Sequence, residues 1–242
     1  MPHTTFAPPG HRVTETQRRT YGFLALRLRV SVARFVVAVV VATSLAAAAE
    51  IDADMRVVIR TYDSVGLPVA DLESAVATAT GILEASGLEM AWHACEVALV
   101  RNTAHPCATP LGANEIAVRI VRLTTEAGYR GELSLGYSLV DTATRSGALA
   151  TIYIDRVAWL SEAAGVDRHV VLGRALAHEV GHLLLGTNAH SQAGLMRAVW
   201  SCKALQRNVR RDWLFAPVDA RAMRQAVRLR AVPQLARLGI GY

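Results

Sequence analysis

The sequence predicts an α+β domain with a small twisted mixed sheet, and three observations carry this prediction. Several short stretches rich in β-branched residues alternate apolar with polar side chains, which is typical of strands. Two longer stretches repeat apolar residues at helical spacing, and a glycine follows each of them. The segments come in the order strand, helix, several strands and helix, which predicts an α+β domain that ends in a small helical part.

The predicted strands are short and rich in β-branched residues. The first, residues 55–63, reads MRVVIRTYD and alternates between apolar and polar side chains. Residues 115–123 read EIAVRIVRL and alternate in the same way. Further strands are predicted at residues 88–94, 135–141 and 148–157.

The two predicted helices are longer and amphipathic. Residues 69–86 form the first, which a glycine closes. Residues 168–185 form the second, with Asp167 as its N-cap and Gly186 at its end. One or two basic helices are expected to finish the chain.

An apolar segment near the N-terminus predicts export. Residues 35–49 read FVVAVVVATSLAAAA, follow several arginines and precede acidic residues. This order is that of a signal peptide, with cleavage expected between Ala47 and Glu50. The segment is short for a membrane span, which needs about 20 apolar residues. Residues 1–49 are thus predicted to be a leader and 50–242 a single domain, periplasmic or extracellular. The alternative is an uncleaved membrane anchor through residues 35–49.

The net charge of +6 comes mostly from the leader. Residues 1–49 hold six arginines and one glutamate, which give +5, and the other 20 basic and 19 acidic residues give +1. The high isoelectric point is therefore no argument for nucleic-acid binding, and none is expected. A composition rich in arginine and alanine and poor in lysine indicates a bacterial origin.

Two of the three cysteines are candidates for a disulfide. Cys95 and Cys107 lie in one loop-like stretch, and disulfides persist in exported proteins. Cys202 is left over.

One short motif indicates a metal site. His178 and His182 are four residues apart on the second predicted helix, so their side chains share one face. Two imidazoles so placed can bind one metal ion. Glu179 follows the first histidine, and its carboxylate would lie beside the ion. In this H-E-x-x-H pattern the histidines bind Zn²⁺ and the glutamate is the general base.

A third zinc ligand is expected after the helix, because a catalytic zinc usually takes three protein ligands and one water. No glutamate follows Glu179 in the sequence. The remaining downstream histidine is His190, and Gly186 lets the chain turn back toward the helix. His190 is therefore the expected third ligand, and Asp212 and Asp219 are the alternatives.

The stretch HEVGHLLLGTNAHSQAGLM, residues 178–196, resembles the metzincin metalloproteases. Their motif, H-E-x-x-H-x-x-G-x-x-H, is followed by a methionine turn. The stretch is most similar to the matrixin branch, because Ser191 follows the third histidine and a Leu-Met pair comes after a short loop. The resemblance implies a zincin fold with an active-site helix, and it implies that Met196 lies beneath the metal as a structural residue.

The chain departs from the metzincin pattern in the ligand loop. Leu185 stands where the family has its glycine, and Gly186 comes one residue later. His190 comes eight residues after His182, where the family has six. The loop therefore carries two extra residues, which suggests a divergent branch. The resemblance covers residues 176–196 strongly and 55–200 loosely, through the order of elements.

A second resemblance concerns substrate binding. Residues 147–154, GALATIYI, resemble the metzincin edge strand, which pairs with an extended substrate. The resemblance implies that Leu149, Ala150 and Thr151 bind a peptide through backbone hydrogen bonds.

These features predict a secreted or periplasmic zinc-dependent endopeptidase that acts on a peptide or protein substrate. A water activated by zinc would attack the peptide carbonyl, with Glu179 as general base. The alternative is a non-catalytic zinc-binding domain that recognises a peptide or a partner. A site closed by a fourth protein ligand would favour the alternative, because such a site has no need of Glu179.

Overall fold

The computed structural model describes residues 55–95, 106–123 and 134–231. The chain divides into two compact units, Met1–Ile51 and Asp52–Tyr242, and every described residue belongs to the second. The expected signal segment, residues 35–49, lies outside the described residues. Within the described ranges, no helix is both long and apolar enough to cross a membrane.

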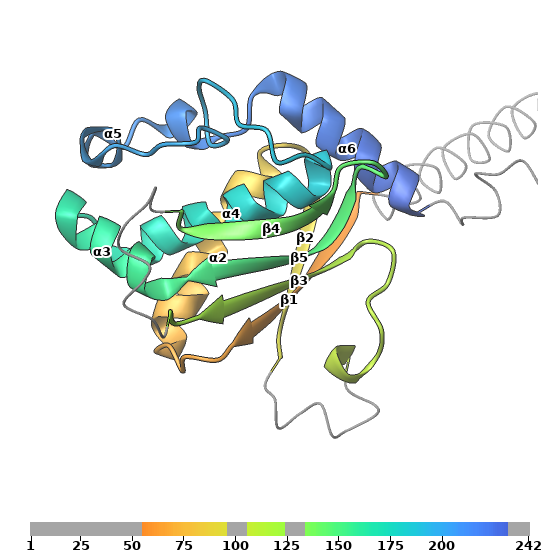
Figure 1. The fold of residues 1–242 in the computed structure, drawn as a ribbon, viewed down its shortest axis with the longest axis horizontal. Coiled ribbons are helices and arrows are strands. Elements are labelled where there is room, and N and C mark those ends of the chain that lie inside the picture. Colours follow the sequence, from red (N-terminus) through yellow and green to blue (C-terminus); the bar gives the residue numbers. More distant parts are fainter. Residues whose placement is uncertain (1–54, 96–105, 124–133, 232–242) are drawn as a thin grey trace, which may run out of the picture. The chain divides into compact units, whose positions relative to one another are not determined.

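The second unit is built on a five-stranded mixed sheet in the order β2-β1-β3-β5-β4 (Figure 1). Only the pair β4 and β5 is antiparallel. Together with the helices described below, this sheet confirms the α+β class. The strands are β1 Arg56–Asp63, β2 Glu89–Ala94, β3 Glu115–Val121, β4 Gly136–Asp141 and β5 Ser146–Tyr153.

The expectation that Leu149–Thr151 lie on the edge strand is wrong. They belong to β5, which is an inner strand between β3 and β4. Leu149, for example, pairs with Ala117 on one side and with Leu139 on the other. The chain turns back after β4, so β5 inserts beside β3 and leaves β4 at the edge.

The strand predicted at residues 148–157 also ends early. Tyr153 is its last residue, and α3, Ile154–Ala164, follows directly. The reason is visible in the burial pattern, because α3 buries Ile154, Val157, Leu160, Ser161 and Ala164 at helical spacing. The helix then ends at Gly165, whose backbone is left-handed.

Helices α2 and α4 cover one face of the sheet. They span Val69–Glu84 and Arg168–Leu185, and they contact each other beside the strands (Figure 1). Every residue of α4 from Val171 to Leu184 is buried. The polar side chains of α4 are therefore buried too, which is costly unless they find partners. The sheet contributes Val57, Ile59, Ile116, Val118, Ile120, Ala150 and Ile152 to this core.

The boundaries of α4 follow its sequence. Asp167 occupies the N-cap position as expected, although its side chain makes no capping hydrogen bond. Gly186 ends the helix with a φ of 63°, a conformation that favours glycine. A Cβ atom at Gly186 would also lie 2.3 Å from the carbonyl oxygen of Arg145. The sharp turn after α4 therefore requires glycine for two reasons.

The C-terminal part of the described chain is helical. Helix α6, Pro217–Ala231, contacts α4, and its Met223 and Val227 are fully buried. The short helix α5, Cys202–Arg207, contacts α3 and begins at Ser201, whose hydroxyl accepts a hydrogen bond from the amide of Ala204.

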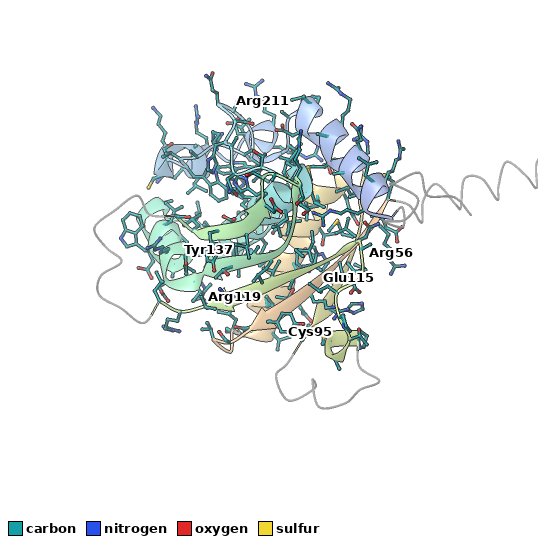
Figure 2. All side chains as sticks on the ribbon, turned by 45° about the vertical axis from the view of Figure 1, so that its right-hand side comes forward. Arg56, Cys95, Glu115, Arg119, Tyr137 and Arg211 are labelled. Atoms are coloured by element: carbon teal, nitrogen blue, oxygen red, sulfur yellow. A yellow bond between two sulfur atoms is a disulfide. The ribbon has the colours of Figure 1, made fainter. Side chains whose placement is uncertain are left out.

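The predicted disulfide between Cys95 and Cys107 is present, with the two Cα atoms 5.7 Å apart (Figure 2). It ties the end of β2 to the short 3₁₀ helix η2, Pro106–Ala108. The carbonyl groups that follow, those of Thr109 and Pro110, accept hydrogen bonds from Arg60 at 2.6 and 3.2 Å. Arg60, which also pairs with Glu115, is only 2% exposed. The disulfide is consistent with an oxidising compartment.

Candidate metal centre

The motif histidines meet on one face of α4. His178 and His182 are both buried, and their Nε2 atoms lie 3.1 Å apart. Each Nδ1 atom is held by a main-chain carbonyl group. His178 Nδ1 lies 3.0 Å from the oxygen of Leu195, and His182 Nδ1 lies 2.8 Å from the oxygen of Thr187.

These partners fix the tautomer of both rings. A carbonyl oxygen only accepts, so Nδ1 must be the donor in each hydrogen bond. In the neutral rings, both Nε2 atoms then carry lone pairs that point at each other without a proton between them. Such an arrangement is stable when a cation lies between the lone pairs, and a partner on Nδ1 is typical of metal-binding histidine.

The loop after α4 brings in the third histidine. The amide of Thr187 donates to the carbonyl oxygen of His182 at 3.3 Å, and the Thr187 hydroxyl accepts from the amide of Ala189 at 3.1 Å. The ring centroids of His190 and His182 are 4.9 Å apart, and those of His190 and His178 are 5.4 Å apart. The two extra loop residues therefore do not keep His190 away from the helix.

The three histidines form a group that could hold one metal ion, because their ligand atoms all lie within 4.8 Å of one another. Two nitrogens bound ~2.0–2.1 Å from one tetrahedral zinc are ~3.3 Å apart, close to the separation of the two Nε2 atoms on α4. Imidazole donors suit zinc and other first-row transition metals. The residues therefore fit a zinc ion. The alternatives from the sequence, Asp212 and Asp219, are not members of this group.

Met196 lies under α4 at Gly181, between the two motif histidines. A Cβ atom at Gly181 would lie 2.9 Å from the sulfur of Met196 and 2.6 Å from Cε1 of Phe215. Both distances are shorter than any normal carbon contact. Met196 is 1% exposed, and the amide of the neighbouring Leu195 donates to the carbonyl oxygen of Leu214 at 2.9 Å. The absence of a side chain at position 181 thus lets Met196 pack directly against α4.

We expect Gly181→Ala to lower the free energy of unfolding by about 1–3 kcal/mol, because the added methyl group must displace Met196 or Phe215. The matched control is Gly81→Ala in α2, where an added Cβ meets no atom within 4 Å. That control should be neutral or stabilising by roughly 0.5–1 kcal/mol. Urea unfolding of both variants measures the difference, and equal effects would contradict the close packing.

Glu179 is buried beside the histidines and is held by the edge strand. The hydroxyl of Ser138, on β4, lies 2.7 Å from the Oε2 atom of Glu179 and 2.7 Å from its carbonyl oxygen. Gly136 on the same strand lets the two elements approach, because a Cβ atom there would lie 3.1 Å from Cγ of Glu179. The carboxylate therefore has a fixed position between α4 and β4.

Burial shifts the pKa of each ionisable group of the motif. It raises the pKa of Glu179 to about 7, and the hydrogen bond from Ser138 offsets part of this rise. It lowers the pKa of His178 to about 4, although the bond to Leu195 acts in the opposite direction. Burial also lowers the pKa of His182. Both helix histidines are thus neutral at ordinary pH, as metal binding requires.

The pH dependence of stability follows from these shifts. In metal-free Glu179→Gln protein, we expect the free energy of unfolding to fall by about 3 kcal/mol as the pH drops from about 6.5 to about 4. Above pH 6.5 His178 is neutral in both the folded and the unfolded state. Between pH 6.5 and about 4 it binds a proton in the unfolded chain but not in the folded one, which favours unfolding. The glutamine background is needed because Glu179 has the opposite effect. Its pKa is raised from 4.5 to about 7, so protonation of Glu179 between these two pH values would stabilise the folded state.

Urea unfolding at a series of pH values measures this dependence. The control adds His178→Asn to the same background and should remove the part of the fall that His178 contributes, leaving the part due to His182. An unchanged slope in the double variant would mean that another group titrates.

The histidines and Glu179 line a cleft of about 700 Å³. One wall is β4 with the residues before it, Ser134–Ser138, and another is formed by Trp159 and Leu160 of α3. The segment Arg197–Trp200 completes the lining. The cleft therefore combines an apolar wall, a strand edge and a group of metal-binding side chains.

Two residues at the site were missed by sequence reasoning. Ser138 carries no signal, because it is 41 residues from Glu179 and the pairing of β4 depends on contacts far along the chain. Trp200 packs edge-on against His178, with ring centroids 5.6 Å apart. Its only signal is its position four residues after Met196.

No model of a known protein family matches the chain, and no curated protein sequence matches it. The geometry of the three-histidine group and its cleft is therefore the basis for a function.

Proposed function

We propose that this chain is an exported zinc-dependent endopeptidase of a divergent, metzincin-like kind. The observation that carries the proposal is the position of Glu179. Its buried carboxylate lies beside the three-histidine group, in a cleft bounded by an edge strand. A site that served only to hold a metal would have no use for such a carboxylate.

In this proposal His178, His182 and His190 hold the ion. Bound zinc supplies Lewis acidity, which polarises a carbonyl oxygen and makes water more acidic. Glu179 takes a proton from the attacking water and passes it to the leaving amine. Burial raises the pKa of Glu179 in the metal-free protein, and a buried carboxylate of this kind is a stronger base than a free one. Ser138 keeps the carboxylate in place.

Strand β4 is the proposed docking edge for the substrate. It is hydrogen-bonded to β5 on one side only, and its residues line the cleft. An extended peptide can add to such an edge through backbone hydrogen bonds. This role replaces the one expected for β5, whose backbone is paired on both sides.

Met196 supports the metzincin-like assignment. It packs against Gly181 directly beneath the motif, where the family resemblance places a structural methionine. The order β1-α2-β2-β3-β4-β5 followed by the motif helix is also what the resemblance implies, with α3 inserted before the helix.

The alternative, a non-catalytic zinc-binding recognition domain, fits the same cleft less well. Structural zinc sites are usually closed by four protein ligands, whereas catalytic sites have three and an open position. Three histidines facing a cleft match the second arrangement.

The test is cleavage of a mixed peptide library by the purified protein, with zinc and with a chelator. Mass spectrometry of the products would locate the bonds that are cut. We expect internal cleavage that requires zinc. Zinc binding without any cleavage would favour the recognition domain.

A further inference from the structure

Two arginines share one indole ring beside the metal centre. Arg174 lies on α4, four residues before His178, and Arg197 follows Met196. The Cζ atom of Arg174 lies 3.9 Å from the ring centroid of Trp213, and that of Arg197 lies 4.8 Å from the same centroid. Two like charges are therefore held together around one aromatic side chain.

Neither charge is neutralised within the part of the chain that the structure describes. Arg174 is 5% exposed and donates to the side-chain oxygen of Asn208, a neutral partner. Neither arginine forms an ion pair there, and one guanidinium nitrogen of each is buried without a hydrogen bond. Burial, with a further effect of Arg197, lowers the pKa of Arg174 to about 10, so it stays cationic at neutral pH. Buried charges without a counter-ion are costly, and an anion would relieve the cost.

The arginines are linked to the metal centre by ring contacts. Trp200 packs edge-on against Trp213, with centroids 5.3 Å apart, and edge-on against His178. Arg197 lines the same cleft as His178 and Glu179. Its backbone is fixed by a bridge to Ser191, whose amide donates to the carbonyl oxygen of Met196 at 2.8 Å. The cation is thus set in a rigid loop at the cleft wall.

We infer that Arg197, supported by Arg174, is a specificity determinant that binds a carboxylate of the substrate within the cleft. This inference rests on the proposed peptidase function. A guanidinium group binds a carboxylate through two parallel hydrogen bonds. Arg197 is a partly exposed cation on the cleft wall, and it has no ion-pair partner in the described residues. The carboxylate is either an acidic side chain near the scissile bond or the free C-terminus of a short peptide.

Three pairs of fluorogenic peptides test the inference with the zinc-loaded protein. Two pairs carry glutamate or glutamine, one on each side of the scissile bond, and the third has a free or an amidated C-terminus. We expect kcat/KM to be roughly 10–100-fold higher for the charged member of one pair, as for hydrogen bonds between charged groups. A preference in the third pair would identify the C-terminus as the source.

Arg197→Met should remove this preference, so that the charged and the neutral member of the pair are cleaved with equal kcat/KM. Arg197→Lys keeps the positive charge but lacks the paired donors of a guanidinium group, so it should show a reduced preference. This variant replaces Arg197→Met in the test if the methionine variant folds poorly. The matched control is Arg211→Met, which also removes one positive charge. Its side chain is 90% exposed at the outer surface (Figure 2) and should leave the preference intact.

Two negative outcomes are distinguishable. If the neutral peptides are cleaved and no pair shows a preference, or if Arg197→Met keeps it, the carboxylate site is overturned and the peptidase function stands. If no peptide is cleaved, the function fails, and fluorescence polarisation with the same peptides still tests the site. Equal binding of charged and neutral peptides by wild type and Arg197→Met would then overturn it.

Discussion

Replacing Glu179 by glutamine is expected to lower kcat/KM for peptide cleavage by about 10²-fold or more, the usual contribution of a general acid–base group. Glutamine keeps the size of the side chain and can still accept the hydrogen bond from Ser138. It cannot take a proton from water at neutral pH. The loss should therefore appear in kcat, with zinc content and secondary structure unchanged.

The measurement compares initial rates for one peptide from the library, together with zinc content by metal analysis. Glu162→Gln is the matched control, because this glutamate is exposed on α3 and should be replaceable without effect. A Glu179→Gln protein that binds zinc and cleaves at the wild-type rate would show that the buried carboxylate does not act as a base.

Zinc binding is expected to stabilise the fold strongly. With free zinc at 1,000 times its dissociation constant, the free energy of unfolding should rise by about 4 kcal/mol. For a domain of this size the midpoint of thermal unfolding would rise by roughly 10 °C. Part of this gain comes from the Nε2 atoms of His178 and His182, which lie 3.1 Å apart. A bound cation would relieve the repulsion between their lone pairs.

His182→Ala should abolish this zinc-dependent shift, and a chelator should reverse it in the wild type. His169→Ala is the matched control, because His169 lies on the same helix and is not a member of the three-histidine group. Differential scanning calorimetry with and without zinc measures the shift. A shift that survives in His182→Ala would place the stabilising ion elsewhere.

The features that the sequence predicted correctly depend on local geometry. The shared face of His178 and His182 follows from their spacing on a helix, and the end of that helix follows from Gly186. The return of His190 depends on one short loop. Cys95 and Cys107 are close in the chain, so their pairing needed no knowledge of the fold.

The features that were wrong or missed depend on distant contacts. Strand β5 was expected at the edge because its residues resemble an edge strand, but strand order is decided by which neighbours pair, and β4 takes that place. The contact of Ser138 with Glu179 exists only once β4 is placed there. Arg174 did carry a local signal, since it is a cation on the buried face of the motif helix, one turn before His178.

The disulfide has a consequence for the order in which the molecule matures. Until Cys95 and Cys107 are oxidised, no covalent crosslink holds η2 against the end of β2, and the loop over Arg60 depends on hydrogen bonds. Thiols remain reduced in the cytosol, so this crosslink would form only in an oxidising compartment. The reduced protein would then be looser at this end of the sheet than the oxidised one, and the final rigidity would be acquired where the disulfide forms.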